Sequence, residues 1–428
     1  MTKWKIYNED AVEWAKNYQK GKFHALLCDA PYHLTSIVKR FGKKDSAPAK
    51  FGTDGVYARA GKGFMGNTWD GGDLAFRPET WEAFGEVLYP GAFGMAFSAS
   101  RNWHRMAVAI EDAGFILHPT IFLWAYGQGF PKATNISKQL HKQGKEDGMW
   151  EGHRYGLQAL KPAVEPIIVF QKPYEGKPLD NIVETGAGSL NIDGGRVSVD
   201  SPVTINRFTN GAKPWGDAKG EEFDTVLSSQ GRWPSNLLLT EESAESLDTQ
   251  TGELASGLMK AGTHKQSTNY GILNQYSPME VEKDTIADSG GASRFFYNVQ
   301  TQIDENDPVY YCGKVSPKER NAGLDEFEEK TTTDGRNKPI DNAFLLGETL
   351  RKNIHPTLKP IDLCKYLATL LLPPIDYAPR RIFVPFSGVA SEMIGAGLAG
   401  WEHVVGVEFD KENGYVDIAE KRLEHWLK

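Results

Sequence analysis

The stretch of sequence that decides the fold spans residues 381–408, RIFVPFSGVASEMIGAGLAGWEHVVGVE. Its first part, 381–388, joins an apolar run of strand length to a turn that contains glycine, and 391–399 has the pattern of a helix. A second apolar run follows and ends at the acid Glu408. Strand, glycine turn, helix, strand and acid is the order in which an α/β sheet binds a nucleoside cofactor, so we expect such a sheet here.

A second motif lies near the other end of the chain. The tetrad DAPY at 29–32 follows FHALLC at 23–28, an apolar run that predicts a strand. An acid, a rigid proline and an aromatic ring therefore stand at the carboxyl end of a strand, which is the edge where open α/β sheets bind ligands. Together the two motifs predict a site whose halves are brought together by folding.

The composition is that of an ordinary globular protein, with 40% apolar and 24% charged residues among 428. This length exceeds the roughly 250 to 300 residues at which single cores stop growing, so we expect two domains. No apolar run approaches the ~18 to 20 residues of a membrane span, and the start, MTKW, has no signal-peptide core. We expect a cytoplasmic protein with no membrane partner.

The cysteines give no sign of a metal site or of disulfides. Cys28, Cys312 and Cys364 lie far apart and form neither a CxxC pair nor a His-rich cluster. We predict reduced thiols and no zinc.

The charge is unevenly distributed. The net charge of −8 argues weakly against a polyanionic partner, because phosphate contacts supply most non-specific DNA affinity. Residues 34–70, however, carry seven basic and three acidic side chains directly after the DAPY tetrad. A basic run is most often a solvated loop. Its position here favours a flexible segment that closes over a nucleic acid strand, with these candidate contacts: Lys39, Arg40, Lys43 and Lys44.

The pattern of elements changes twice along the chain. Strand-like segments lie at 4–7, 23–28, 91–97, 116–124 and 167–170, and helix-like segments lie among them at 11–18, 80–88 and 102–113. Repeated strand and helix segments of this length favour an α/β domain with a largely parallel sheet. Residues 173–345 are rich in small polar and acidic residues with little helical periodicity, and the regular pattern resumes at His355. We predict three parts: 1–172, an inserted loop-rich module at 173–345, and 346–428.

Several short motifs resemble those of one enzyme family, the DNA amino-methyltransferases that use S-adenosylmethionine, in the permuted order with the catalytic motif first. DAPY at 29–32 resembles the catalytic (D/N/S)PPY element, HPTLKP at 355–360 the HPTxKP element, and VPFSG at 384–388 the DPFxGxG cofactor turn. Glu408 and Asp10 match the acids of two further strands. The resemblance covers the first 172 residues and the last 75 well, and the middle only in short islands.

The resemblance implies a circularly permuted Rossmann-like methyltransferase fold, S-adenosylmethionine as cofactor and roles for particular residues. Glu408 would accept hydrogen bonds from the ribose and Phe409 would pack on the adenine, with Asp10 at the adenine amino group. Lys359 and Thr357 would hold the methionine carboxylate, although Lys359 suits a backbone phosphate equally. The remaining cofactor candidates are Asp29, Phe386, Ser387 and Gly388.

Three positions depart from the family pattern. Val384 replaces the Asp that usually begins the cofactor turn, and Ala390 replaces its second Gly. Ala30 replaces the first Pro of the tetrad but keeps the main-chain carbonyl. These changes bear on cofactor affinity more than on the fold, since Gly388 still allows close backbone approach.

The chemistry of methyl transfer explains the residue types of the tetrad, in which Pro31 is the rigid member. An exocyclic amine is a poor nucleophile because its lone pair is delocalised into the base. Asp29 and the carbonyl of Ala30 would each accept an N–H, which aims the lone pair at the methyl group. Tyr32 would stack on a base that has left the duplex, or pack in the core. His355 is given no catalytic role.

The leading hypothesis is a DNA methyltransferase specific for adenine N6, because the cytosine-directed relatives more often carry Ser at the first tetrad position. Cytosine N4 is the alternative within the class. A non-catalytic DNA-binding relative, marked by Val384 and Ala390, is a second hypothesis, and an enzyme of the same fold acting on RNA or protein is a third.

The inserted module is the candidate target-recognition domain. Groove readout needs side chains such as Arg207, Arg232 and Arg294 on a supported surface. Its acidic stretch at 241–253 would face away from DNA. Double-stranded DNA is the predicted partner, and the sequence leaves open a homodimer and a cognate restriction endonuclease.

Overall fold

The computed structural model describes residues 2–33, 72–127, 129, 131–145, 148–198, 203–208, 223–228, 231–256, 264–265, 279–280, 288–300, 315–333, 348–410 and 413–428. The chain divides into two compact units, one formed by Met1–Asn191 with Val299–Lys428 and the other by Ile192–Asn298. The predicted loop at 34–70, with Lys39, Arg40, Lys43 and Lys44, lies outside the described residues, as does Cys312.

The first unit is built on a mixed sheet whose larger part is parallel. Parallel pairings join the strands in the order β1-β20-β19-β2-β3, and antiparallel pairings add β8 and then β5, with β4 also on β8. This confirms the predicted α/β class. The strands span Lys3–Asn8 (β1), His403–Glu408 (β20), Arg381–Pro385 (β19), Phe23–Cys28 (β2), Leu88–Phe97 (β3), Val164–Gln171 (β8), Phe122–Ala125 (β5) and Ile116–Leu117 (β4).

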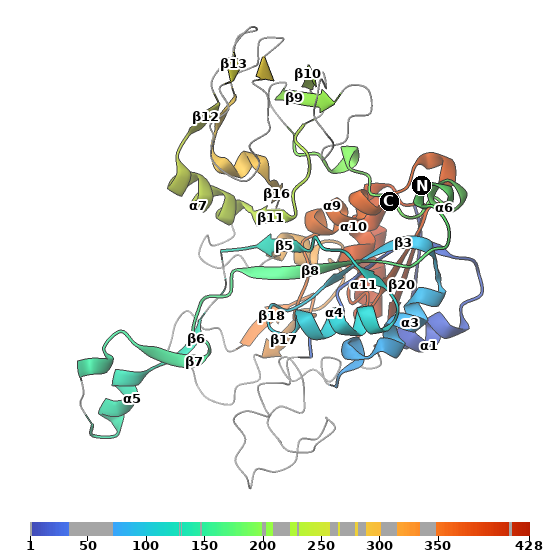
Figure 1. Ribbon diagram of the computed structural model, residues 1–428. Helices are drawn as coiled ribbons and strands as arrows, with labels where there is room; N and C mark the ends of the chain where they lie inside the picture. Colours follow the sequence, from blue (N-terminus) through green and yellow to red (C-terminus); the bar gives the residue numbers. More distant parts are fainter. Residues whose placement is uncertain are drawn as a thin grey trace. The chain divides into compact units, whose positions relative to one another are not determined.

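The sheet reverses its winding direction between β19 and β2. From β19 the chain runs through α10 (Ser391–Ala399) to β20 on one side, and from β2 it runs through α3 (Pro78–Glu86) to β3 on the other. Figure 1 shows α9 (Ile361–Leu371) and α10 on one face of the sheet, and α3 with α1 (Ala11–Asn17) on the opposite face. Such a reversal opens a crevice at the carboxyl ends of the two strands, where α/β proteins bind ligands.

The helices and strands not yet named follow in chain order. In the first unit they are α4 (Trp103–Asp112), β6 (Lys132–Asn135), α5 (Ile136–Lys142), β7 (Arg154–Gln158), α6 (Pro178–Thr185), α8 (Pro317–Asn321), β17 (Lys330–Thr333), β18 (Glu348–Arg351) and α11 (Tyr415–Trp426). In the second unit they are β9 (Val203–Phe208), β10 (Phe223–Ser228), β11 (Leu237–Thr240), α7 (Glu241–Thr251), β12 (Leu254–Ser256), β13 (His264–Lys265), β14 (Met279–Glu280) and β15 (Asp288–Gly290). β16 (Tyr297–Val299) ends at the boundary between the units.

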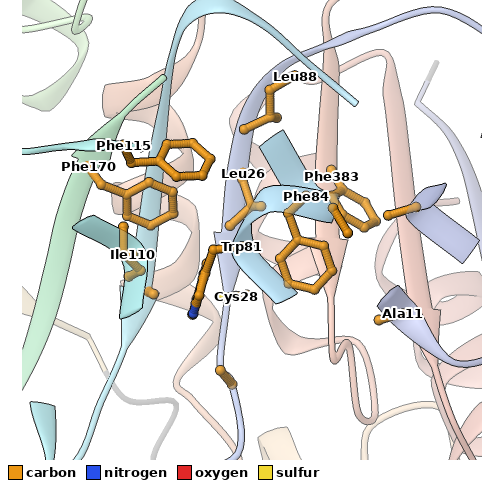
Figure 2. Packing of buried hydrophobic residues seen from close by; sticks show 14 of the residues in the cluster. Ala11, Leu26, Cys28, Trp81, Phe84, Leu88, Ile110, Phe115, Phe170 and Phe383 are labelled. Atoms are coloured by element: carbon orange, nitrogen blue, oxygen red, sulfur yellow. The ribbon is translucent and has the colours of Figure 1, made fainter. Parts of the chain in front are cut away.

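One face of the sheet packs on an aromatic core. Every residue of β2 is buried, as expected for a central parallel strand covered on both faces. Phe84 from α3 meets Phe383 from β19 edge-on at 5.6 Å, and Trp81 meets Phe170 from β8 edge-on at 5.6 Å. Figure 2 shows these side chains gathered against the sheet. This packing fixes the two strands that carry the motifs relative to each other.

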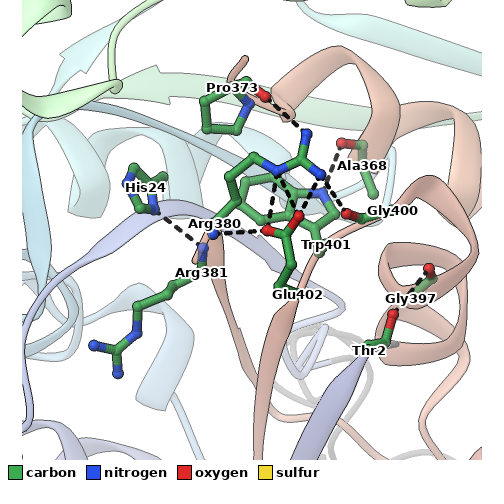
Figure 3. Close-up of polar contacts among 10 residues, drawn as sticks. All are labelled: Thr2, His24, Ala368, Pro373, Arg380, Arg381, Gly397, Gly400, Trp401 and Glu402. Carbon is green, nitrogen blue, oxygen red and sulfur yellow. Dashed lines mark hydrogen bonds and ion pairs between the residues drawn. The ribbon is translucent and has the colours of Figure 1, made fainter. Parts of the chain in front are cut away.

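The amino ends of β19 and β20 are fastened by a polar cluster (Figure 3). The guanidinium of Arg380 donates to both carboxylate oxygens of Glu402 and, over 2.8 Å, to the carbonyl of Gly400. His24 Nδ1 accepts the N–H of Arg381 over 3.0 Å, and burial lowers the pKa of His24 to about 4. A neutral His24 can therefore accept this hydrogen bond across physiological pH, which aligns β19 with β2 at the edge opposite the crevice.

The prediction of one continuous strand at 116–124 is wrong for the middle of that segment. The structure has two strands there, β4 and β5, and both pair with β8. The interruption contains Pro119, which has no N–H to donate to a ladder and therefore breaks regular pairing.

The second unit differs in extent from the predicted module at 173–345. It comprises Ile192–Asn298, and the described parts of 173–191 and 299–345 belong to the first unit. One reason is α6, whose Asn181 donates to the carbonyl of Pro90 at β3 over 3.1 Å. The described residues of the second unit include the antiparallel pair β9–β10 and helix α7.

Candidate functional site

A cavity of about 1800 Å³ opens at the carboxyl ends of β2 and β19 in the first unit. Its lining contains every catalytic and cofactor-binding candidate from the sequence: Asp10, Asp29, Ala30, Pro31, Tyr32, Thr357, Lys359, Phe386, Ser387, Gly388, Glu408 and Phe409. Residues from the two ends of the chain thus meet in one place. The particular role of each residue stays a prediction.

Asp29 stands at the centre of the site in an ion pair with Lys359. The Lys359 ammonium donates to Asp29 Oδ2 and lies 3.9 Å from Glu165 Oε2, and Lys359 is only 4% exposed. Asp29 Oδ1 is buried and has no hydrogen-bond partner among the described residues. One oxygen of this carboxylate is therefore fixed by a counter-ion, and the other remains as an acceptor inside the site.

Tyr32 is held on several sides. Its hydroxyl donates to Glu165 Oε2 over 3.2 Å, and Asn102 Nδ2 donates to its main-chain carbonyl. The Lys359 ammonium lies 5.1 Å from the Tyr32 ring centre and 4.9 Å from that of Phe97. Burial raises the pKa of the Tyr32 hydroxyl, so it acts as a hydrogen-bond donor here. The polar side chains of Glu165 and Lys359 therefore hold the Tyr32 ring in its orientation, and the ring is not packed only against apolar side chains.

The glycine turn after β19 is tightly wound. Phe386, Gly388 and Ala390 have φ angles of 55°, 49° and 69°. The N–H of Ser387 donates to the carbonyl of Val407 over 3.1 Å, and the N–H of Gly388 donates to Glu408 Oε2 over 2.8 Å. These bonds tie the turn to the end of β20. The acid that the sequence assigned to the ribose is thereby anchored at the cavity wall.

Ala390, at the family's second glycine, adopts a conformation that favours glycine. It is fully buried and left-handed at the start of α10. An L side chain in this region costs about 1 to 2 kcal/mol. We expect Ala390→Gly to raise the free energy of unfolding, because glycine adopts this conformation without strain. The gain should be at most about 1 kcal/mol, because glycine also increases the entropy of the unfolded chain, which opposes folding. Urea denaturation tests this. Ala396→Gly, in the right-handed interior of the same helix, should destabilise the protein, and an equal loss in both variants would contradict the prediction.

Glu408 predicts a pH dependence of stability. Burial raises the pKa of Glu408 from 4.5 to about 7, although its bond from Gly388 opposes this shift. Between these two pH values the folded protein holds a proton on Glu408 that the unfolded chain releases. The contribution of Glu408 to the free energy of unfolding is therefore complete below pH 4.5 and is lost as the pH rises through about 7. We expect Glu408→Gln to gain stability relative to the wild type across this window in denaturation series at several pH values. The exposed variant Glu420→Gln should show no such trend.

His355 makes structural contacts at the cavity wall. Its Nδ1 contacts the carbonyl of Thr357 and its ring meets Tyr415 edge-on at 4.6 Å. Burial lowers the pKa of His355 to about 4, so the ring is neutral. A Cβ on Gly388 would lie 3.3 Å from His355 Nε2, which adds close packing to the positive φ as a reason for glycine there.

Asp10 caps helix α1 and also lines the cavity. Its Oδ1 accepts the N–H groups of Val12 and Glu13 over 2.9 and 3.1 Å. Val384, in contrast, is fully buried within β19 opposite Gly406. The position at which the family carries an acid is thus an apolar strand interior in this chain.

Sequence reasoning missed two acids in the site, Glu165 and Glu392. Glu165 comes from β8 and Glu392 from the first turn of α10; both are buried and line the cavity. Burial, together with the charge of Asp29, raises the pKa of Glu392 to about 7. An acid in the first turn of the helix that follows the glycine turn was the available sequence signal for Glu392.

The candidate base-reading residues make internal contacts in the second unit. Arg232 and Arg294 converge on Asp288 Oδ2, with nitrogen–oxygen distances of 2.8 and 3.2 Å. Their side chains are 13% and 16% exposed, so the structure uses both to hold this unit together. Arg207 lies in β9, and its side chain is outside the described set. Their proposed DNA contacts remain predictions.

The remaining sequence expectations concern thiols, metals and membranes. Cys28 and Cys364 are buried free thiols whose pKa values burial raises. The described residues contain no cluster of His, Cys, Asp and Glu suited to a metal ion. No helix within the described ranges is both long and apolar enough to cross a membrane.

The chain is similar in sequence to a known methyltransferase. It shares 28% identity over 207 residues with the type II methyltransferase M.HindIII of Haemophilus influenzae, and the match covers 44% of this chain and 64% of that protein. The chain therefore spans less than two thirds of this relative's length. No protein-family model matches the sequence. The similarity to M.HindIII confirms the predicted resemblance to methyltransferases.

Two solved structures are also similar over most of the chain. The crystal structure of M1.HpyAVI matches with a TM-score of 0.36 and 12% identity, covering 98% of each chain. The PvuII DNA methyltransferase, described as cytosine-N4-specific, matches with a TM-score of 0.40 and 10% identity, covering 98% of this chain and 86% of that one.

Proposed function

We propose that this chain is an S-adenosylmethionine-dependent DNA methyltransferase that acts on the N6 amino group of adenine in duplex DNA. The observation that carries the proposal is the meeting of DAPY at 29–32 with the glycine turn and Glu408 in one cavity at the reversal point of the sheet. The sequence similarity to the type II methyltransferase M.HindIII supports methyl transfer.

The residues present fit this cofactor. Glu408 offers a carboxylate acceptor for a ribose diol beside the backbone of a turn that approaches closely because of Gly388. Phe409, which is exposed at the cavity rim, suits the face of an adenine ring. S-adenosylmethionine would supply an electrophilic methyl group and leave as a neutral thioether. The protein then has to bind, orient and desolvate rather than provide a strong base.

The target amine would be positioned by Asp29 and Ala30. Asp29 Oδ1, the buried acceptor, would take one N–H while Lys359 holds Oδ2 in place. The carbonyl of Ala30 would take the other N–H, and the Tyr32 ring would support the base that has left the duplex. Because Tyr32 is fixed by Glu165 and Asn102, the orientation of the ring is set before DNA binds.

The proposal is tested by transfer of a labelled methyl group from S-adenosylmethionine to unmethylated duplex DNA. We expect incorporation by the wild type, and nucleoside mass spectrometry should show 6-methyladenine. Finding 4-methylcytosine instead would keep the enzyme class and overturn the choice of base. Incorporation into RNA or protein but not DNA would overturn the substrate.

A binding-only relative is the second candidate, because Val384 and Ala390 depart from the cofactor pattern. Calorimetry with S-adenosylmethionine separates the two proposals. An enzyme binds the cofactor, whereas the binding-only relative holds DNA and shows no heat of cofactor binding.

A further inference from the structure

Glu392 is a buried acid for which the proposed mechanism has no use. It lies in the first turn of α10, is 4% exposed and borders the cavity beside Ser387, Gly388 and Ser391. Residue 392 lies outside the three motifs that resemble those of the DNA amino-methyltransferases, at 29–32, 355–360 and 384–388. A carboxyl group is costly to bury unless a partner compensates for the lost water.

The charges that face Glu392 come from three other elements. Asp29 follows β2, Lys359 precedes α9, and Arg422 belongs to α11; the neutral thiols of Cys28 and Cys364 lie nearby. Lys359 is engaged by Asp29 and lies 3.9 Å from Glu165. In this part of the cavity wall, the carboxyl groups of Asp29, Glu165 and Glu392 therefore share the ammonium of Lys359.

Arg422 contacts the residues around the glycine turn without lining the cavity. It is fully buried, and its Nη1 donates to the carbonyl of Val389 and, over 3.4 Å, to Ser391 Oγ. The hydrogen bond from Arg422 to Val389 holds the residue that follows Gly388 in the glycine turn. Immediately around Lys359, the acids Asp29, Glu165 and Glu392 outnumber this cation, which leaves room for a further positive charge. The other basic side chains of the cavity lining belong to other segments: Arg101, Lys132, Lys161, Arg320 and Arg351.

We infer that Glu392, together with Asp29, forms an anionic seat for the cationic methionine end of S-adenosylmethionine. The inference rests on the proposed function, because it assigns a residue to that cofactor. The methionine end carries an ammonium and a sulfonium, and either cation suits a desolvated carboxylate. The seat would take the place of the family's Asp at Val384 as a source of negative charge beside the turn.

A cation in the seat should also change the protonation of Glu392. Burial and the charge of Asp29 raise the pKa of Glu392 to about 7, so part of the population is protonated near neutrality. An arriving cation favours the carboxylate, and the proton leaves to solvent. Cofactor binding should therefore release protons, and affinity should rise with pH through this range.

Calorimetry with purified full-length protein tests the seat. We expect Glu392→Gln to weaken S-adenosylmethionine binding by about 10-fold or more, which is the effect of ~1.4 kcal/mol from one lost charge pair. S-adenosylhomocysteine separates the two cations, because it has the ammonium and lacks the sulfonium. An equal loss for both ligands places the ammonium in the seat, and a loss for S-adenosylmethionine alone places the sulfonium there.

The matched control is Glu319→Gln. Glu319 is also a buried acid whose pKa burial raises, but it accepts the N–H of Ile361 over 2.8 Å and does not line the cavity. Its variant should keep the wild-type cofactor affinity. Wild-type affinity in Glu392→Gln would overturn the inference while leaving the proposed function intact, and absence of binding to the wild type would overturn the proposed function itself.

A measurement on the wild type covers the case in which Glu392→Gln fails to fold. Proton release is measured between about pH 6 and pH 7, below the usual pKa of about 7.7 to 8.0 for a free α-amino group. Adenosine serves as the reference because it engages Glu408 but has no cationic end. Greater proton release with S-adenosylmethionine than with adenosine supports the seat, and equal release overturns it.

Discussion

Methyl transfer by the Asp29→Asn variant is expected to fall by about 100- to 10,000-fold, the usual effect of losing a positioned proton acceptor or a charge-stabilising group. The substitution keeps the size of the side chain but removes the charge opposite Lys359. It also presents an amide nitrogen to either the ammonium or the target amine, and both are donors. The loss should appear in kcat at saturating DNA and cofactor.

Two measurements make this result specific to Asp29. Asp376→Asn makes the same chemical change at an exposed position outside the cavity and should retain activity. Thermal denaturation must show that Asp29→Asn is folded under the assay conditions. A folded variant with wild-type kcat would remove Asp29 from the mechanism.

The Lys359→Met variant should lose about 3 to 5 kcal/mol of unfolding free energy, because breaking a buried ion pair leaves charge without compensation. In this case Asp29 and Glu165 would both lose their shared cation. Urea denaturation of the variant and the wild type measures this loss.

A surface lysine provides the comparison. Lys421 pairs with Glu424 over 2.9 Å, and both side chains are about half exposed. Lys421→Met should change stability by less than about 0.5 kcal/mol, as surface substitutions generally do. Equal losses in the two variants would show that Lys359 is not compensating buried charge.

The convergence of the two sequence motifs could be predicted because carboxyl ends of parallel strands meet at one edge. Glu165 could not be found in this way. It lies on β8, which pairs antiparallel with β3 and therefore brings its amino end to the same edge. Its place follows from the direction of one strand, and that direction depends on tertiary pairing rather than on local pattern.

Other differences from expectation have equally local causes. The single strand expected at 116–124 is divided at a segment that contains Pro119, and the middle module is shortened because α6 packs on β3. The role of Arg422 in bracing the glycine turn also depends on tertiary packing, since an arginine within an amphipathic helix predicts an exposed side chain. The apolar pattern of the sequence was thus sufficient to predict the sheet, whereas the positions of the buried charged side chains could be found only from the folded structure.

The order of strands has a consequence for how the protein is made. β1 and β2 are synthesised first but do not pair with each other, because β20 and β19, synthesised last, lie between them. The DAPY tetrad therefore emerges from the ribosome long before the strands that complete its sheet. Long-range parallel pairing of this kind forms slowly. A nascent chain would carry DAPY with an open sheet edge, and methylation could begin only after the final strands have docked.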